Sequence, residues 1–182
     1  MKITFFSAAL IVAATPVAAQ TCPQQGENAP MALHEAWMME GWERTEGDPE
    51  FIFAEEMNRY YDLESQDGVF YDNFAPGETQ LFDNAAIYGA NWEDLQNGAR
   101  SILHALTGGN DQIVSDSVAS TTLGFVGRID RLDGAIIAFD GRSQLGWVCT
   151  QGVWKIRHEL NYAWVVEPEE IAHYYRQTGA AE

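Results

Sequence analysis

The clearest structural signal in this chain lies in Gly141-Arg142-Ser143-Gln144-Leu145-Gly146-Trp147-Val148-Cys149 and, after a turn, in Val153-Trp154-Lys155-Ile156-Arg157-His158-Glu159-Leu160-Asn161. Apolar and polar residues alternate along both segments, which predicts two long antiparallel strands. On the second strand this alternation places Trp154, Ile156, His158 and Leu160 on one face. That face is apolar except for one imidazole, which is typical of a ligand cavity and equally of a core with one hydrogen-bonded histidine.

The residues around this hairpin continue the β pattern. Gln151-Gly152 and Asp130-Arg131-Leu132-Asp133-Gly134 are turn sequences that separate the apolar segments. We therefore expect strands over residues 113–129 (one long strand or two), 135–149 and 153–165, and a shorter strand over 69–74. Residues 81–88 are expected to form a second short strand or an irregular flap.

The rest of the chain carries helical patterns. Asp48-Pro49-Glu50 has an N-cap acid, a proline in the first turn and an acid near the positive end of the helix dipole. Asn91 and Asp94 resemble a capping box, and the apolar residues that follow step by three and four up to Leu106. We expect helices over residues 31–42, 48–61, 91–106 and 167–177. Helices, a strand, a helix and then an antiparallel meander indicate an α+β fold.

The first 19 residues have the layout of a secretory signal peptide. Lys2 precedes an apolar run from Ile3 to Ala14, and Val17-Ala18-Ala19 supplies small residues for a cleavage site. An apolar run of roughly 12 residues is too short to span a bilayer comfortably. We therefore predict a signal peptide over 1–19, a polar leader over 20–30 and a single domain over 31–182, located in the periplasm or outside the cell.

Acidic residues dominate the charge of the chain. It has 27 Asp and Glu against 10 Lys and Arg, a formal net charge of −17 that becomes −18 if Lys2 leaves with the signal peptide. Such a charge repels phosphate backbones and anionic lipids. The composition therefore argues against nucleic acid as a partner and, after signal cleavage, against a membrane surface.

Cys22 and Cys149 are the only two cysteines. An even count in an oxidising compartment is compatible with a disulfide that ties the N-terminal segment to the strand over 135–149. Two unpaired thiols, one of them on a loose terminus, are equally compatible with the sequence.

The order of helices and strands from about Met31 to Trp164 resembles the SnoaL-like, ketosteroid-isomerase-like group of the nuclear transport factor 2 superfamily. Two local patterns support the resemblance: the Asp that closes Val69-Phe70-Tyr71-Asp72, and the strand Gly152-x-Trp154-x-Ile156-x-His158-Glu159. The resemblance implies a cystatin-like α+β roll, in which a strongly curved antiparallel sheet wraps around about three helices and encloses an apolar pocket. Many members end this strand His-Glu-His, whereas this chain has Leu160 in place of the second histidine.

Members of this group include isomerases, dehydratases, polyketide cyclases and proteins that only bind ligands or assemble. The resemblance therefore implies a pocket for a small apolar or aromatic molecule. It also makes the outer sheet face, toward which Arg142, Gln144 and Gly146 point, a candidate surface for homodimerisation.

Asp72 and His158 are the candidate catalytic residues. In an apolar cone the pKa of Asp72 would rise, which suits it to remove a proton next to a carbonyl, as the resemblance to ketosteroid isomerases implies. The alternative, which the sequence favours, is that Asp72 caps the turn that begins at Asn73. His158 is a candidate general acid or base, or a core histidine bonded to a backbone carbonyl or a tyrosine hydroxyl.

Aromatic residues supply the other candidates. Tyrosines near the pocket could act as oxyanion-type donors, and tryptophans could form flat apolar walls. All of them are equally compatible with a place in the core. The candidate ligand-binding residues are Tyr60, Tyr71, Trp92, Trp147 and Trp154.

Several other chemistries lack their motifs. His158 and Glu159 are adjacent on a strand and face opposite ways, which disfavours a shared metal, and the sequence has no His-Glu-x-x-His or Cys-x-x-Cys. It also lacks a phosphate loop and a dinucleotide fingerprint, so we expect no metal and no organic cofactor. The remaining histidines fall on expected helices, and His104 is expected to be solvated.

Two functional hypotheses result. The first is a secreted pocket protein with isomerase, dehydratase or cyclase activity, in which Asp72 is the base and His158 with a tyrosine polarises the substrate. The second is a non-catalytic module that uses the same cone for ligand binding or dimerisation. Leu160 favours the second because it removes one polar group from the presumed pocket face.

Overall fold

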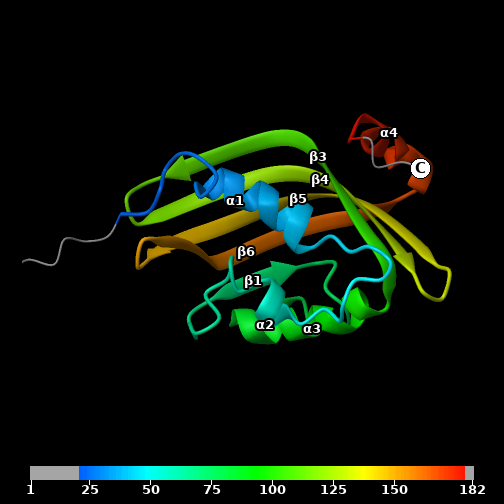
Figure 1. Ribbon diagram of the computed structural model, residues 1–182, viewed down its shortest axis with the longest axis horizontal. Helices are drawn as coiled ribbons and strands as arrows, with labels where there is room; N and C mark the ends of the chain where they lie inside the picture. The colour runs from blue at the N-terminus through cyan, green and yellow to red at the C-terminus, as the bar shows by residue number, and fades with distance from the viewer. Residues whose placement is uncertain (1–20, 179–182) are drawn as a thin grey trace, which may run out of the picture.

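A curved six-stranded sheet forms the centre of the computed structural model, which describes residues 21–178 (Figure 1). The predicted signal peptide lies outside the described residues. The strand order is β2-β1-β6-β5-β4-β3. The strands are β1 (Val69–Asp72), β2 (Leu81–Phe82), β3 (Ala99–Val114), β4 (Val118–Arg131), β5 (Ile136–Thr150) and β6 (Val153–Val166). The helices are α1 (Pro30–Ala36), η1 (Trp37–Gly41), α2 (Phe53–Glu56), α3 (Ala85–Asn97) and α4 (Pro168–Thr178).

The hairpin between β5 and β6 confirms the expected pair of long strands. Thr150 pairs with Val153, and Gln151 and Gly152 between them both have positive φ, at 53° and 82°. Two positive φ values are the requirement of a type I′ turn, whose twist matches that of the flanking strands. The α+β class and the curved sheet are likewise as expected, but the sheet is mixed. β1 runs parallel to β6, because the preceding segment is already bridged in parallel from Tyr61 to Ile156.

The third helix differs most from expectation. It spans Ala85–Asn97 instead of 91–106, and Asn84 is its N-cap, accepting a hydrogen bond from the Ile87 amide at 2.9 Å. Gly98 ends it, and the Ala- and Leu-rich segment that follows is the strand β3, paired with β4 along its length. Cross-strand pairing outweighs the helical propensity of this segment. The second helix is also shorter than expected, a single turn over Phe53–Glu56.

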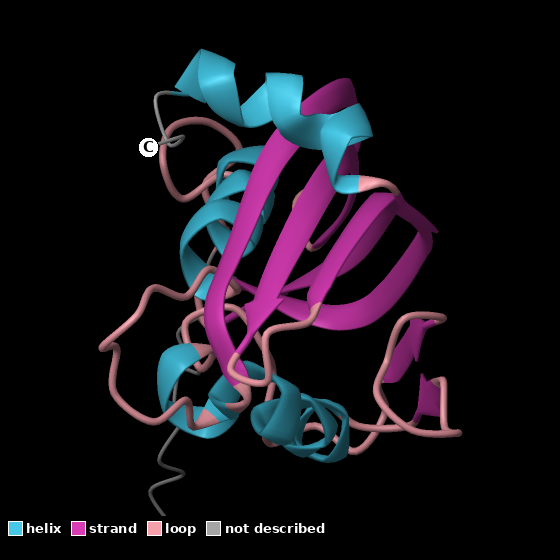
Figure 2. Cartoon of the chain, turned by 90° about the vertical axis from the view of Figure 1, so that its right-hand side faces the viewer, coloured by secondary structure: helices cyan, strands magenta, loops and turns pink. Residues whose placement is uncertain are grey.

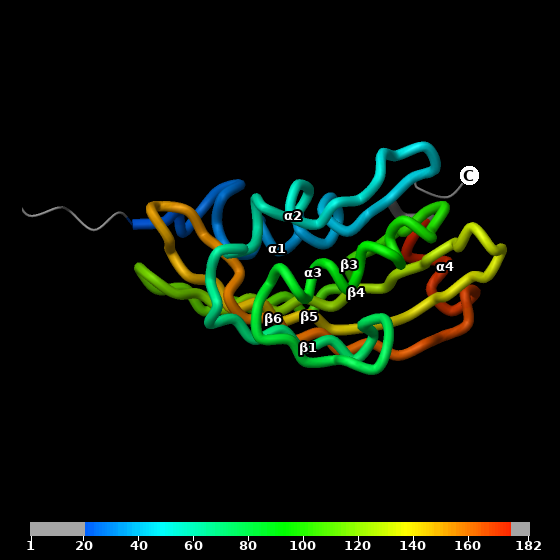
Figure 3. Tube along the Cα trace, turned by 90° about the horizontal axis from the view of Figure 1, so that it is seen from below, coloured from blue at the N-terminus to red at the C-terminus, as the bar shows by residue number. Residues whose placement is uncertain are grey.

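The two faces of the sheet have different cover. The concave inner face packs against α1, η1, α2 and α3, and Figure 3 shows α1 and α2 together on one side of the long strands. The outer face is covered at one end by α4 (Figure 2), where Ile171 and Tyr175 pack on Ala105, Val126 and Ala138. Inward residues of β5, including Ser143, Leu145 and Trp147, are buried as the alternation predicts.

A buried polar cluster holds α1 against the sheet. The ring nitrogens of His34 lie 2.8 Å from the Thr121 hydroxyl and 3.0 Å from the Ser143 hydroxyl. The Trp147 indole also donates to Thr121. Burial lowers the pKa of His34 to about 3, so the ring is neutral and bridges two hydroxyls as a structural link.

A β-bulge at Arg157 interrupts β6. Gly146 pairs with His158 and Trp147 pairs with Ile156, so Arg157 is an extra residue with no partner on β5. Its guanidinium is held by Asp62 at 2.7 Å. One extra residue moves every later side chain to the opposite face of the sheet.

The inward-facing residues of β6 after the bulge are therefore Glu159, Asn161 and Ala163, all buried. His158 and Leu160 are exposed on the outer face. The expectation that they face inward is wrong, because the strict alternation on which it rests ends at Arg157.

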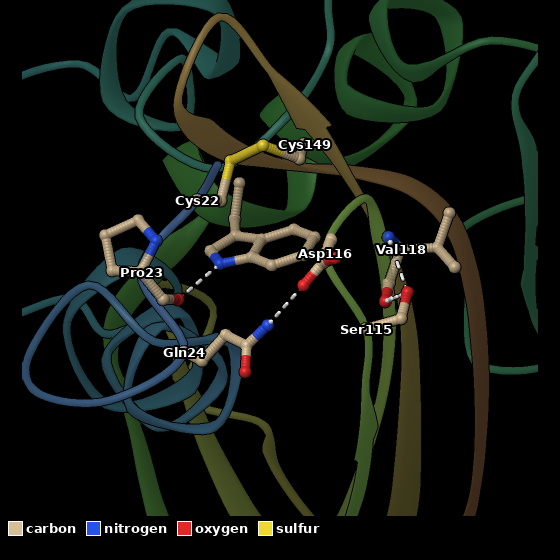
Figure 4. The surroundings of a disulfide bond; sticks show 8 residues. Cys22, Pro23, Gln24, Ser115, Asp116, Val118 and Cys149 are labelled. Atoms are coloured by element: carbon tan, nitrogen blue, oxygen red, sulfur yellow. Dashed lines mark hydrogen bonds between the residues drawn. A yellow bond between two sulfur atoms is a disulfide. The ribbon is translucent and has the colours of Figure 1, made fainter. Parts of the chain in front are cut away.

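A disulfide between Cys22 and Cys149 joins the first described residues to β5, 127 residues away (Figure 4). Two further contacts hold the same segment: the Trp154 indole donates to the Pro23 carbonyl at 2.6 Å, and the Gln24 amide donates to Asp116 at 3.2 Å. The alternative that the sequence left open is thus settled in favour of the bridge. Among residues 21–178, no helix has the length and apolar character that a membrane span requires.

The Cys22–Cys149 bridge closes a long loop, so we expect its removal to lower the free energy of unfolding by about 4–5 kcal/mol. The double variant Cys22→Ser/Cys149→Ser, compared with the oxidised protein by urea denaturation, measures this loss. Gln24→Ala serves as the control for the weaker contact in the same segment. An unchanged midpoint in the double variant would contradict the prediction.

Candidate functional site

A cavity of about 70 Å³ lies between the inner face of the sheet and the helices. It has about half the volume of an engineered protein cavity of about 150 Å³ that holds benzene, so it suits a small molecule. Its walls are mostly aromatic and aliphatic. They comprise Trp37, Met38, Trp42, Asp72, Phe74, Tyr88, Trp92, Leu95, Gln96, Ile102, His104, Phe125, Ile129, Phe139, Asn161 and Ala163.

Two buried carboxyl groups meet at one wall of this cavity. Asp72, at the end of β1, lines it, and Glu159 on β6 lies behind Asp72. The Asn161 amide donates to both, at 3.0 Å to Asp72 and 2.6 Å to Glu159. The Tyr88 hydroxyl also reaches both, at 3.4 Å and 2.6 Å. The second oxygen of Glu159 accepts from Tyr61 at 2.5 Å.

Burial governs the protonation of this pair. It raises the pKa of Asp72 to about 6, against the opposing effect of hydrogen bonds from Asn161, the Phe74 amide and Tyr88. It raises the pKa of Glu159 to about 8, and the nearby charge of Asp72 acts in the same direction. Burial is the larger cause at both groups, and repulsion from the Asp72 charge adds to it at Glu159. Glu159 is therefore the weaker acid of the two and favours its protonated form at neutral pH.

Asp72 also has the structural role that the sequence suggested as its alternative. Its Oδ1 accepts from the Phe74 amide at 2.7 Å, and its backbone carbonyl accepts from the Ala75 amide at 3.3 Å. The turn fixes the carboxyl group in place, and Oδ2 remains for the hydrogen bonds at the cavity wall. Capping and a place at the cavity are therefore compatible.

Most of the other predicted site residues do not line the cavity. Trp92 lines the cavity. Tyr60, Trp147 and Trp154 are buried in the core but do not line it. Tyr71 is half-buried and alternates with the inward Phe70 and Asp72, so it points to the outer face. His158 is exposed on that face too, and Asp72 and His158 do not share the cavity.

Several polar residues of the site could not be recognised from the sequence pattern. Glu159 and Asn161 face inward only because of the bulge at Arg157. His104, expected to be solvated on a helix, is buried on β3 and lines the cavity. Gly98 was the available signal for His104, since a glycine that ends a helix there places the following residues outside it.

The described part of the chain holds no group of three or more His, Cys, Asp or Glu side chains arranged to bind a metal ion. The chemistry that this arrangement can perform is proton transfer at Asp72, next to hydrogen-bond donors and inside an apolar enclosure.

No protein-family model matches the sequence, and no curated protein is significantly similar to it. Solved structures do resemble the fold. A putative calcium/calmodulin dependent protein kinase II association domain from Xanthomonas campestris superposes with a TM-score of 0.54 at 14% identity, covering 85% of this chain and 98% of that one. An uncharacterised protein with a cystatin-like fold from Caulobacter vibrioides gives 0.52 at 18% identity, covering 84% and 99%.

A nuclear transport factor 2 (NTF2-like) superfamily protein from Salmonella enterica serovar Typhimurium gives a TM-score of 0.50 at 13% identity, covering 59% of this chain and 75% of that one. At these identities the similarity is one of fold alone. The chain thus has the cystatin-like, NTF2-like fold that the sequence resemblance implied, without a finding that singles out the SnoaL-like group.

Proposed function

We propose that this protein binds a small molecule in the cavity and transfers a proton to or from it through Asp72, as an isomerase, dehydratase or cyclase would. The observation that carries the proposal is the position of Asp72: a fixed carboxyl group, 5% exposed, at the wall of an otherwise mostly apolar cavity. Its pKa of about 6 makes it mostly ionised at neutral pH yet more basic than an exposed aspartate, as general-base catalysis requires.

Glu159 acts in this proposal as a positioning residue. Because it is protonated at neutral pH, it leaves Asp72 as the single negative charge of the pair. Tyr88 and Asn161, which both bond Glu159 and Asp72, hold the base in one orientation. His158, which faces away from the cavity, has no part in the mechanism.

We place the protein in an oxidising compartment, the periplasm or the extracellular space. The disulfide between Cys22 and Cys149 supports this location, because such bonds persist where thiols are not kept reduced. The signal-peptide pattern of residues 1–19 agrees with it.

The second candidate function is assembly through the outer sheet face. Leu160, Tyr162 and Trp164 on β6 are each about half exposed on this face, and the Tyr162 and Trp164 rings are 6.0 Å apart. A row of large apolar side chains on a sheet surface is typical of an interaction site. We propose that a second copy of the chain covers it; the structurally similar Xanthomonas protein is named an association domain, which is compatible with this proposal.

The first prediction from this proposal tests Asp72 as a base. We expect the protein to accelerate exchange of the α-hydrogens of acetone for deuterium, measured by NMR in D₂O. Asp72→Asn should slow this exchange by about 100-fold, the lower range for loss of a general base. The rate should rise with pH through about 6 as the base ionises. Asp67→Asn, at an exposed loop residue, is the matched control; exchange in Asp72→Asn as fast as in this control would refute the role of Asp72.

The second prediction follows from Glu159. Its pKa lies at about 8 in the folded protein against an ordinary value of 4.5, so the folded state holds an extra proton in this window and stability falls as pH rises. Asp72 adds to this fall below about pH 6. His34 and His104, whose pKa values burial lowers to about 3 and 4, act in the opposite direction below about pH 6.5. Between pH 6.5 and 8, Glu159 therefore dominates the slope.

We expect the free energy of unfolding to fall by roughly 1 kcal/mol per pH unit between pH 6.5 and 8. Glu159→Gln should remove most of this slope, whereas Glu64→Gln, at an exposed acid, should keep it. Urea denaturation at several pH values measures both. The assignment fails if the slope persists in Glu159→Gln.

The third prediction concerns the outer face. If a second copy covers β6, the protein is a dimer in solution, and Trp164→Ser converts it to a monomer because it removes apolar area at the contact. Light scattering coupled to size-exclusion chromatography reports the mass. Leu132→Ser, which changes an exposed apolar residue in the β4–β5 turn, should leave the dimer intact. A monomeric unmodified protein would rule out this use of the face.

A further inference from the structure

Buried polar atoms without a hydrogen-bond partner gather around the cavity. Among the described residues six buried side-chain nitrogen or oxygen atoms have no partner, and five of them belong to residues that line the cavity. The five are Trp42 Nε1, Trp92 Nε1, Gln96 Oε1, His104 Nδ1 and Asn161 Oδ1; the sixth, Arg157 Nε, lies at the bulge. Native proteins pair nearly all such atoms, so their concentration at one place indicates a polar occupant.

The hydrogen bonds of the neighbouring groups determine whether each of these atoms acts as a donor or as an acceptor. Asn161 directs its NH₂ group at ionised Asp72, which can only accept, and at Glu159 Oε1, so its Oδ1 remains as an acceptor. Gln96 donates its NH₂ to the Trp42 carbonyl at 3.2 Å, which leaves Oε1 as an acceptor in the same way. The indoles of Trp42 and Trp92, with ring centres 5.6 Å apart, offer N–H donors only.

His104, on the sheet side of the cavity, carries the last of these unpaired polar atoms. Its ring contacts the edges of Phe125 and Phe139, each with centres 6.1 Å away, and its Nδ1 has no hydrogen-bond partner. Burial lowers the pKa of the ring to about 4, so it is neutral and offers one donor and one acceptor.

An occupant that satisfies these atoms needs both kinds of group. The two indole N–H groups require an acceptor oxygen, and the two amide oxygens require a donor such as a hydroxyl. A hydrocarbon would leave all of them unpaired. An anion is disfavoured, because no Lys or Arg lines the cavity and Asp72 does.

Building on the proposed function of the cavity, we propose that its ligand is a small neutral hydroxy ketone or hydroxy aldehyde, with the polar group formed by Trp42, Trp92, Gln96 and His104 as its binding subsite. This narrows the apolar or aromatic ligand expected from the sequence. The carbonyl oxygen accepts from the indoles and the hydroxyl donates to an amide oxygen. The cavity of about 70 Å³ limits the ligand to a few carbon atoms around these groups.

The test compares three probes of five non-hydrogen atoms each at pH 7: hydroxyacetone, the hydrocarbon 2-methylbutane and the anion propionate. Binding is followed by the NMR signals of the indole N–H groups. We expect hydroxyacetone to bind at least tenfold more tightly than the other two and to move the Trp42 and Trp92 signals downfield. Gln96→Met should reduce this preference about tenfold, whereas Gln66→Met, the same change at an exposed residue outside the cavity, should not.

His104→Leu separates a binding role from a structural one. If the polar atoms of His104 had only a structural role, replacing the residue would lower the stability of the protein. Removal of an unpaired buried polar atom, by contrast, leaves that stability unchanged or raises it. We expect His104→Leu to keep or raise the thermal midpoint of the free protein, by up to about 3 °C, and to weaken binding of hydroxyacetone about tenfold. A lowered midpoint with unchanged binding would overturn the subsite.

The inference also fails if the hydrocarbon or the anion binds as tightly as hydroxyacetone, or if none of the three binds, in which case ordered water satisfies these atoms. Its failure is distinguishable from that of the proposed function. Tight binding of hydroxyacetone with acetone exchange that does not depend on Asp72 refutes only the catalytic proposal. Exchange that depends on Asp72 without a preference for the hydroxy ketone refutes only the subsite.

Discussion

The β-bulge at Arg157 is the constraint on which the candidate site depends. A strand without it would place His158 and Leu160 inside and Glu159 and Asn161 in water. With it, β6 contributes apolar Trp154 and Ile156 to the core at one end and a carboxyl and an amide at the other. The ion pair of Arg157 with Asp62 anchors the extra residue at the place where β6 changes its neighbour from the Tyr61 segment to β1.

This reversal gives the interior two regions of different character. Near the disulfide, the core is apolar and its polar atoms are paired, as in the cluster of His34, Thr121 and Ser143. Around the cavity, burial keeps a proton on Glu159 and leaves indole, amide and imidazole groups without partners. Unpaired polar groups and buried carboxyls reduce stability. Groups that reduce stability in this way are typical of functional sites, where a bound ligand pairs with them and offsets the loss.

The strands were more predictable from the sequence than the helices. Long alternating segments with turn sequences between them, such as Gln151-Gly152, are recognisable because a strand repeats every two residues. The segment from Ala99 to Leu106 is rich in Ala and Leu at helical spacing, yet pairs with β4 as a strand. Asp72 was found because it ends a strand. His104, Gln96 and Asn161 were not, because their place at the cavity depends on elements distant in the sequence.

The sequence by itself determined the α+β class, the β5–β6 hairpin and the NTF2-like order of elements, since these follow from local periodicity and turn residues. Only the tertiary structure decided which side chains meet at the cavity, because a one-residue bulge leaves the apolar pattern of β6 nearly unchanged while it reverses the face of every residue beyond it. It likewise decided the bridge between Cys22 and Cys149, since two cysteines 127 residues apart pair only if the fold brings them together.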